Sequence, residues 1–329
     1  MGFQVGCTGL IRYVTPLVSP MNGVRKRFRA ATSLQGALPG ATPPSGILVV
    51  NKPQNWTSFD VVNKIRSVLE KHLRQHETAS VAAGPVEAST KAATRHRDRR
   101  FRLRVGHSGT LDPLATGVLV LAVGPVYTRQ LRDLQQGRKQ YRATFQLGAA
   151  TDTQDCTGQV LERSSYEHLK EYGVDEINRL LQSAAFTGKI MQQVPAYSAV
   201  RVQGQRLYEL AREGRINSIN ELPSRTITIF EARCEHFDSQ QGTGTLFLDC
   251  SGGTYVRTLI HDMGRRLGTH AHMTSLVRLR VGSYSLDESN EHCLRTVEEL
   301  SDPERILACL QSTNVSSTTS TSSERAASQ

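Results

Sequence analysis

The apolar residues of this 329-residue chain occur in short runs. The longest candidates, Ile47–Val50 and Val118–Val123, have the length of β-strands. A transmembrane helix needs about 18 or more consecutive apolar residues, so we expect no membrane-spanning helix. The chain is long enough to bury a proper core, as one large domain or two ordinary ones.

Predicted strands and helices are intermixed between residues 46 and 310, without a repeat of about 20–50 residues. Alternating or continuous apolar residues predict strands at Gly46–Asn51, Val118–Val123, Tyr141–Leu147, Arg225–His236, Thr243–Cys250 and Leu276–Tyr284. Helical periodicity predicts helices from Thr57 to about Leu73 and over Thr128–Gln135, Asp175–Phe186, Gln205–Glu213, Tyr255–Leu267 and parts of 296–310. The pattern indicates one α/β (α+β) domain around a mostly antiparallel sheet.

The formal net charge of +10 comes from two segments. Residues 1–46 hold five basic residues and no acidic one, and residues 74–104 hold eight basic and three acidic residues. Each segment therefore contributes +5, and the remainder sums to zero. Net charge of this sign favours an acidic partner such as nucleic acid, but the predicted core itself is neutral.

Both basic segments have the composition of regions outside a packed core. Residues 1–45 are expected to be a disordered leader, and a basic, acid-free, Ser/Thr-bearing leader is typical of a mitochondrial transit peptide. Pro16 and Pro20 interrupt any amphipathic helix there, so a nuclear or cytoplasmic tail is the alternative. We expect a low-complexity insertion at about 75–100, a folded domain over 46–310, and a disordered Ser/Thr-rich tail at 311–329.

Cysteine and histidine spacing predicts no metal site. The six cysteines are widely spaced without a C-x-x-C pair, which indicates neither a zinc site nor a disulfide framework and fits a reducing compartment. His270 and His272 are interpreted as ordinary loop or helix-end residues.

The segment Val105–Gly117, VGHSGTLDPLATG, carries the strongest chemical signal. Its glycines allow the backbone to approach a ligand closely, and Asp112 is its only carboxylate. An aspartate in an apolar, sharply turned loop acts as a nucleophile or base, or it forms a turn before proline. The residues alone leave both interpretations open.

Two further segments suggest contact with an anion or a base. Ser251–Thr254 precedes a predicted helix, where backbone N–H groups can meet an anion, and Tyr255 and Arg257 follow. Arg138–Arg142, RKQYR, interleaves an aromatic residue with cations, a pattern suited to base stacking with phosphate contact. A capped helix with a solvated arginine and a solvated hairpin end are the respective alternatives.

With these and further segments, the chain resembles the TruB family of tRNA pseudouridine synthases. The matching segments, in family order, are GILVVNKPQNWTS (Gly46–Ser58), VGHSGTLDPLATGVL (Val105–Leu119), KQYRATFQLGAATDTQDCTGQV (Lys139–Val160), QVPAYSAVRVQGQRLYELAREG (Gln193–Gly214), SRTITI (Ser224–Ile229), CSGGTYVRTLIHDMGRRLG (Cys250–Gly268) and LVRLRVGSY (Leu276–Tyr284). The resemblance implies the pseudouridine synthase fold, a mixed, largely antiparallel sheet flanked by helices around a central RNA-binding cleft.

The chain departs from the family pattern in three places. Pro195–Ala199 is one residue shorter than the usual P-P-x-Y-S-A, and Gly124–Arg129 is one residue longer than the usual G-x-x-T-K, with arginine for lysine. The short polar tail leads us to expect no C-terminal PUA domain, unlike bacterial members.

The resemblance implies an isomerase that converts uridine to pseudouridine at position 55 of the tRNA T-loop. It needs no cofactor and no metal. Asp112 is implied as the catalytic carboxylate, which attacks covalently or removes a proton from the sugar. Arg257 would pair with it, Tyr141 would stack on the flipped base, and Tyr255 would line the pocket near C5.

The implied RNA contacts are more widely spread. His107 would splay the RNA loop or contact the flipped nucleotide, Lys52 and Pro53 would support the catalytic loop, and Leu279 would form a pocket wall. The full set of expected substrate-binding residues is His107, Lys52, Pro53, Leu279, Arg129, Arg138, Lys139 and Arg142.

The expected partner is the tRNA T-arm, with other structured RNA such as mRNA hairpins as further candidates, and we expect a monomer that binds no membrane. The main alternative is a non-catalytic RNA-binding protein or tRNA-folding chaperone that uses the same cleft. A base-releasing glycosylase would need a second, water-activating carboxylate beside Asp112, which the motifs do not provide. A guide-dependent, dyskerin-like enzyme is disfavoured by the missing PUA domain.

Overall fold

The computed structural model describes residues 43–81, 102–216, 219, 221–286 and 293–310. Most of the predicted leader, residues 82–101 of the predicted insertion and the predicted tail lie outside these residues. All described residues belong to one compact unit. No helix among them is both long and apolar enough to cross a membrane.

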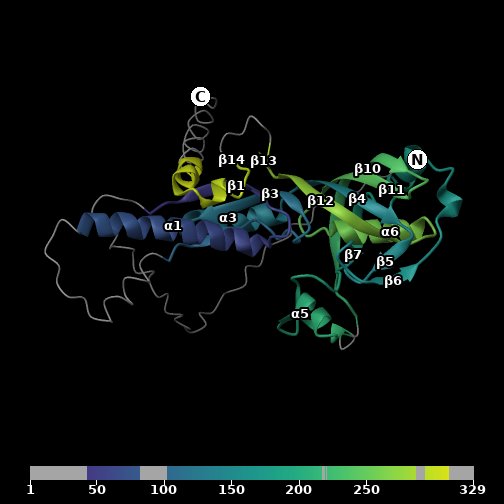
Figure 1. Ribbon diagram of the computed structural model, residues 1–329. Coiled ribbons are helices and arrows are strands. Elements are labelled where there is room, and N and C mark those ends of the chain that lie inside the picture. Colours follow the sequence, from purple (N-terminus) through teal and green to yellow (C-terminus); the bar gives the residue numbers. More distant parts are fainter. Residues whose placement is uncertain (1–42, 82–101, 217–218, 220, 287–292, 311–329) are drawn as a thin grey trace, which may run out of the picture. The chain divides into compact units, whose positions relative to one another are not determined.

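A ten-stranded mixed sheet organises the fold (Figure 1). Its main path runs β14-β1-β3-β12-β4-β11-β10-β7, with β2 paired to β3 and β13 paired to β12. The strands are β1 (Gly46–Lys52), β2 (Val105–His107), β3 (Thr116–Val123), β4 (Lys139–Leu147), β7 (Gly188–Gln193), β10 (Ser224–Asp238), β11 (Thr243–Cys250), β12 (Ala271–Val281), β13 (Tyr284–Ser285) and β14 (Cys293–Leu294). The β1–β14 and β3–β12 pairs are parallel and the other pairs antiparallel, which confirms the predicted mixed, largely antiparallel sheet.

Helices and two small hairpins complete the described fold. The helices are α1 (Ser58–Val81), α3 (Pro125–Gln136), α4 (Val174–Leu181), α5 (Leu207–Arg212), α6 (Val256–Arg266), the 3-10 turns η1 (Glu167–Leu169) and η3 (Glu299–Ser301), and helical residues 303–310. The hairpins pair β5 (Ala149–Thr151) with β6 (Val160–Arg163) and β8 (Arg201–Val202) with β9 (Gln205–Arg206).

Strands β1 and β3 are apolar on both faces because helices cover both. Leu48 and Leu119 share one buried cluster with residues of α1 and of the helical segment 303–310. Val49 and Val120 belong to a second cluster that includes Leu131 of α3. A strand that is buried on both faces has apolar residues at consecutive positions. This explains why β1 and β3 appear in the sequence as continuous apolar runs.

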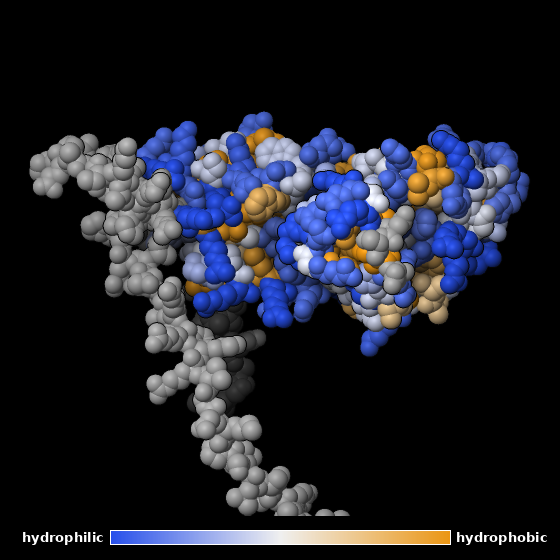
Figure 2. Space-filling model, turned by 90° about the horizontal axis from the view of Figure 1, so that it is seen from below, coloured by the Kyte–Doolittle hydropathy of each residue, from blue (hydrophilic) through white to orange (hydrophobic). Residues whose placement is uncertain are grey.

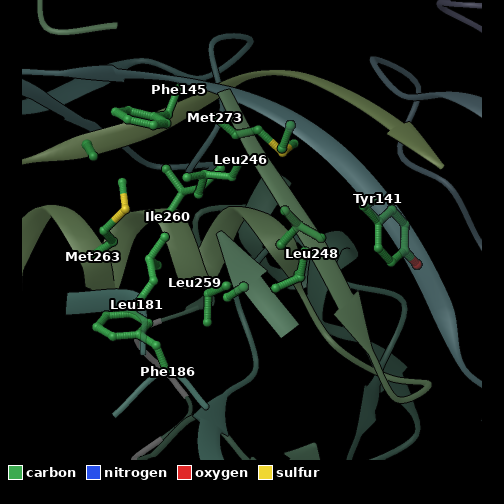
Figure 3. Packing of buried hydrophobic residues seen from close by; sticks show 14 of the residues in the cluster. Tyr141, Phe145, Leu181, Phe186, Leu246, Leu248, Leu259, Ile260, Met263 and Met273 are labelled. Atoms are coloured by element: carbon green, nitrogen blue, oxygen red, sulfur yellow. The ribbon is translucent and has the colours of Figure 1, made fainter. Parts of the chain in front are cut away.

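The remainder of the sheet packs on one face and carries polar residues on the other. Phe145 and Met273 of the sheet pack with Leu259, Ile260 and other residues of α6 in the largest buried cluster (Figure 3). Every second residue of β4 is buried, so the intervening side chains point to the opposite face. Figure 2 shows one side of the molecule, where hydrophilic residues cover most of the surface and hydrophobic ones gather in separate patches.

Three predicted helix boundaries need correction. Helix α1 continues to Val81, past the predicted end near Leu73 and into the predicted insertion, because the residues after Leu73 are compatible with a helix even without an apolar stripe. Helix α4 ends at Leu181 rather than Phe186, and α5 begins at Leu207 after the β8–β9 hairpin. At the start of α1, Thr57 and Asp60 exchange the hydrogen bonds of a capping box.

Candidate active site

The loop between β2 and β3 presents Asp112 at the surface on a base of buried residues. The neighbouring Leu111 and Ala115 are buried, whereas the Asp112 side chain is 34% exposed. The turn is closed by a 3.0 Å hydrogen bond from the Ala115 N–H to the Asp112 carbonyl. The apolar neighbours therefore hold the backbone while the carboxylate remains accessible.

Residues between β1 and α1 fix this loop from one side. Lys52 Nζ donates to the carbonyl of Pro113 at 3.2 Å, and the Asn55 N–H donates to the same oxygen at 2.8 Å. Ser58 Oγ accepts from the Leu111 N–H at 2.9 Å and lies 3.3 Å from the Leu111 carbonyl. The segment NKPQNWTS thus supports both residues that flank Asp112, as expected for Lys52.

Lys52 itself is fully buried, so its expected role as a direct RNA ligand does not fit this structure. Its Nζ also donates to the carbonyls of Pro53 at 2.7 Å and Trp56 at 2.6 Å. Burial lowers the pKa of Lys52 from 10.5 to about 8, against the opposing effect of Asp112. Pro53, directly after the end of β1, is half-buried.

Arg278 of β12 fixes the loop from the other side. Its guanidinium is buried, and it donates from Nε to the Val118 carbonyl at 2.7 Å and from Nη2 to the Gly109 carbonyl at 3.3 Å. Gly117 pairs with Arg278 across β3 and β12, and a Cβ at Gly117 would lie 2.2 Å from the Arg278 carbonyl oxygen. Glycine is therefore required at 117, where φ is +99°.

Arg257 of α6 reaches Asp112, as the resemblance implied. Its side chain is 4% exposed, and its Nε lies 3.3 Å from Asp112 Oδ2. The two terminal nitrogens are held by backbone carbonyls, Nη1 by Thr153 at 2.9 Å and Nη2 by Tyr197 at 2.6 Å. Among the described residues, the buried Nε has no hydrogen-bond acceptor, Asp112 included, so its contact with Asp112 is an ion pair without a hydrogen bond.

Gln192 of β7 is a positioning residue that the sequence analysis missed. Its buried side-chain amide accepts from the Tyr255 N–H at 2.8 Å and donates to the Tyr255 carbonyl at 2.9 Å. This pair of bonds sets the start of α6, and Arg257 lies two residues further on. A glutamine in a strand gives no sequence signal of such a role, because its partner is distant in the chain.

The Tyr255 ring lies between two arginines. The Arg225 guanidinium carbon is 5.1 Å from the ring centroid, and that of Arg257 is 5.7 Å away. Both distances fit cation–π contacts. The structure therefore places Tyr255 beside the Asp112–Arg257 pair, and its contact with a base stays a prediction.

Tyr141 is more deeply buried than a stacking platform requires. It is 7% exposed and belongs to the large buried cluster, where Figure 3 shows it at one end with its hydroxyl directed away from the other labelled side chains. Burial raises the pKa of Tyr141 to about 12, although a hydrogen bond with Arg278 acts in the opposite direction. The phenol is therefore protonated at neutral pH.

Arg138 and Arg142 are not brought to Asp112, which corrects the interpretation of RKQYR as one cluster. Successive residues of a strand point to opposite faces, so these arginines lie on the face opposite Tyr141. Arg138 pairs with Asp249 at 2.6 Å, and Arg142 pairs with Glu235 at 2.7 Å. Both cations are engaged by carboxylates on that far face.

Lys139 is also corrected from an RNA ligand to a structural cation. Its buried Nζ donates to the carbonyls of Leu134 at 3.1 Å, Gln135 at 2.7 Å and Gly137 at 2.8 Å. Three bonds use all the donors of an ammonium group. Lys139 therefore satisfies the last carbonyls of α3 and has no donor left for a phosphate.

His107 borders a hollow of about 480 Å³ beside the catalytic loop. Its Nδ1 accepts from the Gly109 N–H at 3.2 Å, and burial lowers its pKa. The hollow is lined by Phe59, Val62, Arg104, Val105, Gly106, His107, Thr128, Leu131, Arg132 and Gln135. The lining therefore combines arginines with a histidine and a phenylalanine, residue types that also occur in nucleic-acid contacts.

The two remaining predicted residues lie at separate places. Arg129 is exposed on α3. Leu279 is half-buried at an irregularity in the pairing of β12 with β4. Their RNA contacts stay predictions.

Comparison with known proteins gives one consistent family. The profile described as "TruB family pseudouridylate synthase (N terminal domain)" matches residues 96–256, and "tRNA pseudouridylate synthase B C-terminal domain" matches residues 257–311. The chain is 40% identical to tRNA pseudouridine synthase B of Geobacter sulfurreducens over 74% of this chain and 66% of that protein. It is 38% identical to the protein of the same name from Thermobifida fusca over 74% and 72% of the respective chains.

A solved structure of a Cbf5–Nop10–Gar1 complex is also similar, with a TM-score of 0.48 and 24% identity over 78% of this chain and 53% of that chain. The chain spans about two thirds of the length of the two bacterial relatives.

Proposed function

The chain belongs to the TruB family of pseudouridine synthases, and we propose that it converts uridine to pseudouridine in tRNA. One observation carries the proposal. The partly exposed Asp112 carboxylate lies 3.3 Å from a buried arginine, on a loop that buried lysine, serine and arginine side chains fix from both sides. This arrangement suits a single carboxylate that acts at a defined position.

The reaction breaks the N1–C1′ glycosidic bond, turns the uracil and forms a C5–C1′ bond. A proton leaves C5 and one is gained at N1, so the net change is an isomerisation that needs no redox step. Asp112 either attacks the ribose or removes a proton from it. Arg257 orients the carboxylate through charge attraction and is itself immobilised by two carbonyls.

The uridine must leave its stack to reach Asp112. We assign Tyr141 and Tyr255 to the walls that receive the base, because both lie on the Asp112 side of the sheet close to Arg278 or Arg257. We assign His107 and Arg132, which line the hollow beside the loop, to contact with the RNA next to the flipped uridine. Leu279 completes the pocket wall.

Substitution of Asp112 by asparagine tests the proposal directly. Asparagine keeps the shape but removes the charge and basicity, so we expect pseudouridine formation to fall by more than roughly 10²-fold while tRNA binding survives. Mass-spectrometric detection of pseudouridine and filter binding of tRNA measure the two quantities. Asp133→Asn, at an exposed position of α3, is the matched control and should keep full activity.

Turnover by Asp112→Asn at the control rate would remove Asp112 from the chemistry. Absence of pseudouridine formation by the unaltered protein, together with intact tRNA folding activity, would support the non-catalytic chaperone function instead.

Arg257→Lys tests the orientation of the carboxylate. Lysine keeps the charge but has one nitrogen in place of the planar fork, so it cannot reproduce the separate positions from which Nη1 and Nη2 bond the Thr153 and Tyr197 carbonyls and Nε faces Asp112. We expect kcat to fall by roughly 10²-fold, because small displacements of a reacting group have effects of this size. Single-turnover rates at saturating enzyme measure the effect, and a wild-type rate would show that the ion pair is dispensable.

We propose the T-arm uridine at position 55 as the tRNA target, with mRNA hairpins as further substrates, and a monomer as the acting species. The support is the family resemblance of the motifs around Asp112 and Arg257. Pseudouridine mapping in RNA from cells that lack the protein, with mitochondrial and cytosolic tRNA separated, tests the target. Unchanged modification at position 55 in both pools would overturn it, and light scattering of the purified protein tests the monomer.

We also propose that the basic, acid-free residues 1–45 direct the protein to mitochondria. The support is their composition alone. A fusion of residues 1–45 to a fluorescent protein should accumulate in mitochondria, and a version with Arg25, Lys26, Arg27 and Arg29 changed to glutamine should not. Nuclear or cytoplasmic fluorescence of the unaltered fusion would favour the alternative.

A further inference from the structure

Three side chains that can ligate a metal meet in the C-terminal half of α1. His72 and His76 are four residues apart on α1, and their ring centroids are 4.3 Å apart. Glu304, from the helical residues 303–310, places Oε1 3.6 Å from His72 Nε2. One ligand atom from each residue lies within 4.8 Å of the others.

The donor set is that of a zinc-type site. Two imidazoles four residues apart on a helix can bind one ion from the same face, and a carboxylate from a second element supplies the third ligand. In a tetrahedral zinc site, bonds of about 2.0–2.2 Å separate the ligand atoms by about 3.3–3.5 Å. The 3.6 Å between His72 Nε2 and Glu304 Oε1 is close to this, and all three ligand atoms lie within 4.8 Å of one another, so small side-chain movements would bring them together.

A simple ion pair between His72 and Glu304 leaves the position of His76 unexplained. The His76 ring lies 4.3 Å from the His72 ring and takes no part in such a pair. A divalent cation would bind both imidazoles and the carboxylate together. The adjacent Arg305 is paired with Glu299 at 3.7 Å, which occupies the cation nearest to Glu304 in sequence.

The position of the cluster indicates what such an ion would do. On its N-terminal side along α1, Ile65 and Leu69 share a buried cluster with Ile306 and Leu310 of the helical residues 303–310. From residue 74 to residue 76, the α1 side chains Arg74, Gln75 and His76 are exposed. A bound ion would therefore extend the attachment of residues 303–310 along α1 beyond the apolar contacts.

We propose that His72, His76 and Glu304 bind one divalent transition-metal ion, with Zn²⁺ as the best match, and that the ion fastens residues 303–310 to α1. The site is separate from Asp112 and does not take part in the proposed isomerisation.

The test uses the full-length protein after removal of metal by a chelator. Titration with Zn²⁺ in a calorimeter should show one ion per chain, and Zn²⁺ should raise the midpoint of thermal unfolding. His76→Asn and Glu304→Gln change exposed side chains, and each should weaken Zn²⁺ binding by more than roughly tenfold. Glu171→Gln, at another exposed glutamate, is the matched control and should bind as the wild type does.

Titration with Co²⁺ identifies the ligand type. A site of nitrogen and oxygen ligands lacks the strong near-ultraviolet absorption of cobalt–thiolate bonds, so such absorption would point to cysteines instead. Wild-type Zn²⁺ affinity in His76→Asn would overturn the site, and wild-type affinity in Glu304→Gln would overturn the link to residues 303–310. Pseudouridine formation by the metal-free protein is expected to persist, so failure of this inference is distinguishable from failure of the proposed function.

Discussion

Two buried lysines use the same chemistry for different purposes. Lys52 Nζ and Lys139 Nζ each donate to three backbone carbonyls, and burial lowers the pKa of each to about 8. All partners of Lys139 lie within five residues of it, so it closes the end of α3. Lys52 also reaches Pro113, 61 residues away, and so joins β1 to the catalytic loop.

The position of the acceptors, rather than the lysine itself, therefore decides whether such a cation supports local structure or the active site. A cation bound to local carbonyls stabilises one helix end, as a C-terminal cap does. A cation bound across two segments also fixes their relative position. Only the second arrangement should couple to the geometry of Asp112.

The largest expected effect that separates the two is on catalysis. Lys52→Met removes the support of Pro113, and we expect kcat for pseudouridine formation to fall by roughly 10²-fold, because a displacement near 1 Å has this effect. Lys139→Met should leave kcat unchanged while lowering the free energy of unfolding by about 1–3 kcal/mol, since three carbonyls lose their donor. Single-turnover kinetics and urea unfolding measure these quantities.

An equal loss of kcat in Lys52→Met and Lys139→Met would contradict this distinction between the two lysines. In that case, the end of α3 contributes to the site as much as the β1–α1 segment does.

A smaller effect is expected in the pH dependence. Each lysine has a pKa of about 8 in the folded protein and 10.5 in the unfolded chain, so between these values the unfolded chain binds more protons. The contribution of each lysine to the free energy of unfolding therefore rises as pH increases from about 8 to 10.5. Each methionine variant should lack one such rise relative to the wild type, as measured by urea unfolding at several pH values.

The pH dependence of kcat should distinguish Lys52 from Lys139 between about pH 8 and 10.5. Above about pH 8, Lys52 loses its charge and has two N–H donors for three carbonyls, so kcat should decline in the wild type and in Lys139→Met. Lys52→Met should lack this decline. Its persistence in Lys52→Met would assign the titration to another group.

The smallest effects are expected at the arginines on the far face of β4. Arg138→Ala and Arg142→Ala should change the free energy of tRNA binding by no more than about 0.5 kcal/mol, because their carboxylate partners and opposite orientation keep them from the site. Arg132→Ala, at the hollow beside His107, should weaken binding and reduce the salt slope by about 1. Filter binding at several salt concentrations measures both, and a reversed order would place the RNA on the far face.

The strands and the Asp112–Arg257 pair were accessible from sequence because each rests on a strong local signal. Alternation located β4, β10 and β11, and the resemblance of the GTLDPLATG loop and of the start of α6 predicted the pair. The grouping of Arg138 with Tyr141 was avoidable, since a period of two already separates neighbours in a strand. A direct RNA contact by Lys52 or Lys139 requires an exposed side chain, and both are buried.

The burial of Lys52, Lys139 and Arg278 could not be predicted from the sequence, because their partners are backbone carbonyls. A carbonyl carries no residue-type signal, and it becomes an acceptor only when a distant segment or a helix end leaves it unpaired. Gln192 escaped notice for the same reason, since its partners are the backbone groups of Tyr255.

The close approach of Gly117 to Arg278 has a consequence for the order in which the site is assembled. The supports from residues 51–58 precede the catalytic loop in the chain, so they are available as soon as the loop has been synthesised. The Arg278 contacts to Val118 and Gly109 wait for β12, more than 150 residues later. A nascent chain that ends before β12 would carry the complete motif around Asp112 with only one of its two supports, so the last strands of the sheet decide when the loop becomes fixed.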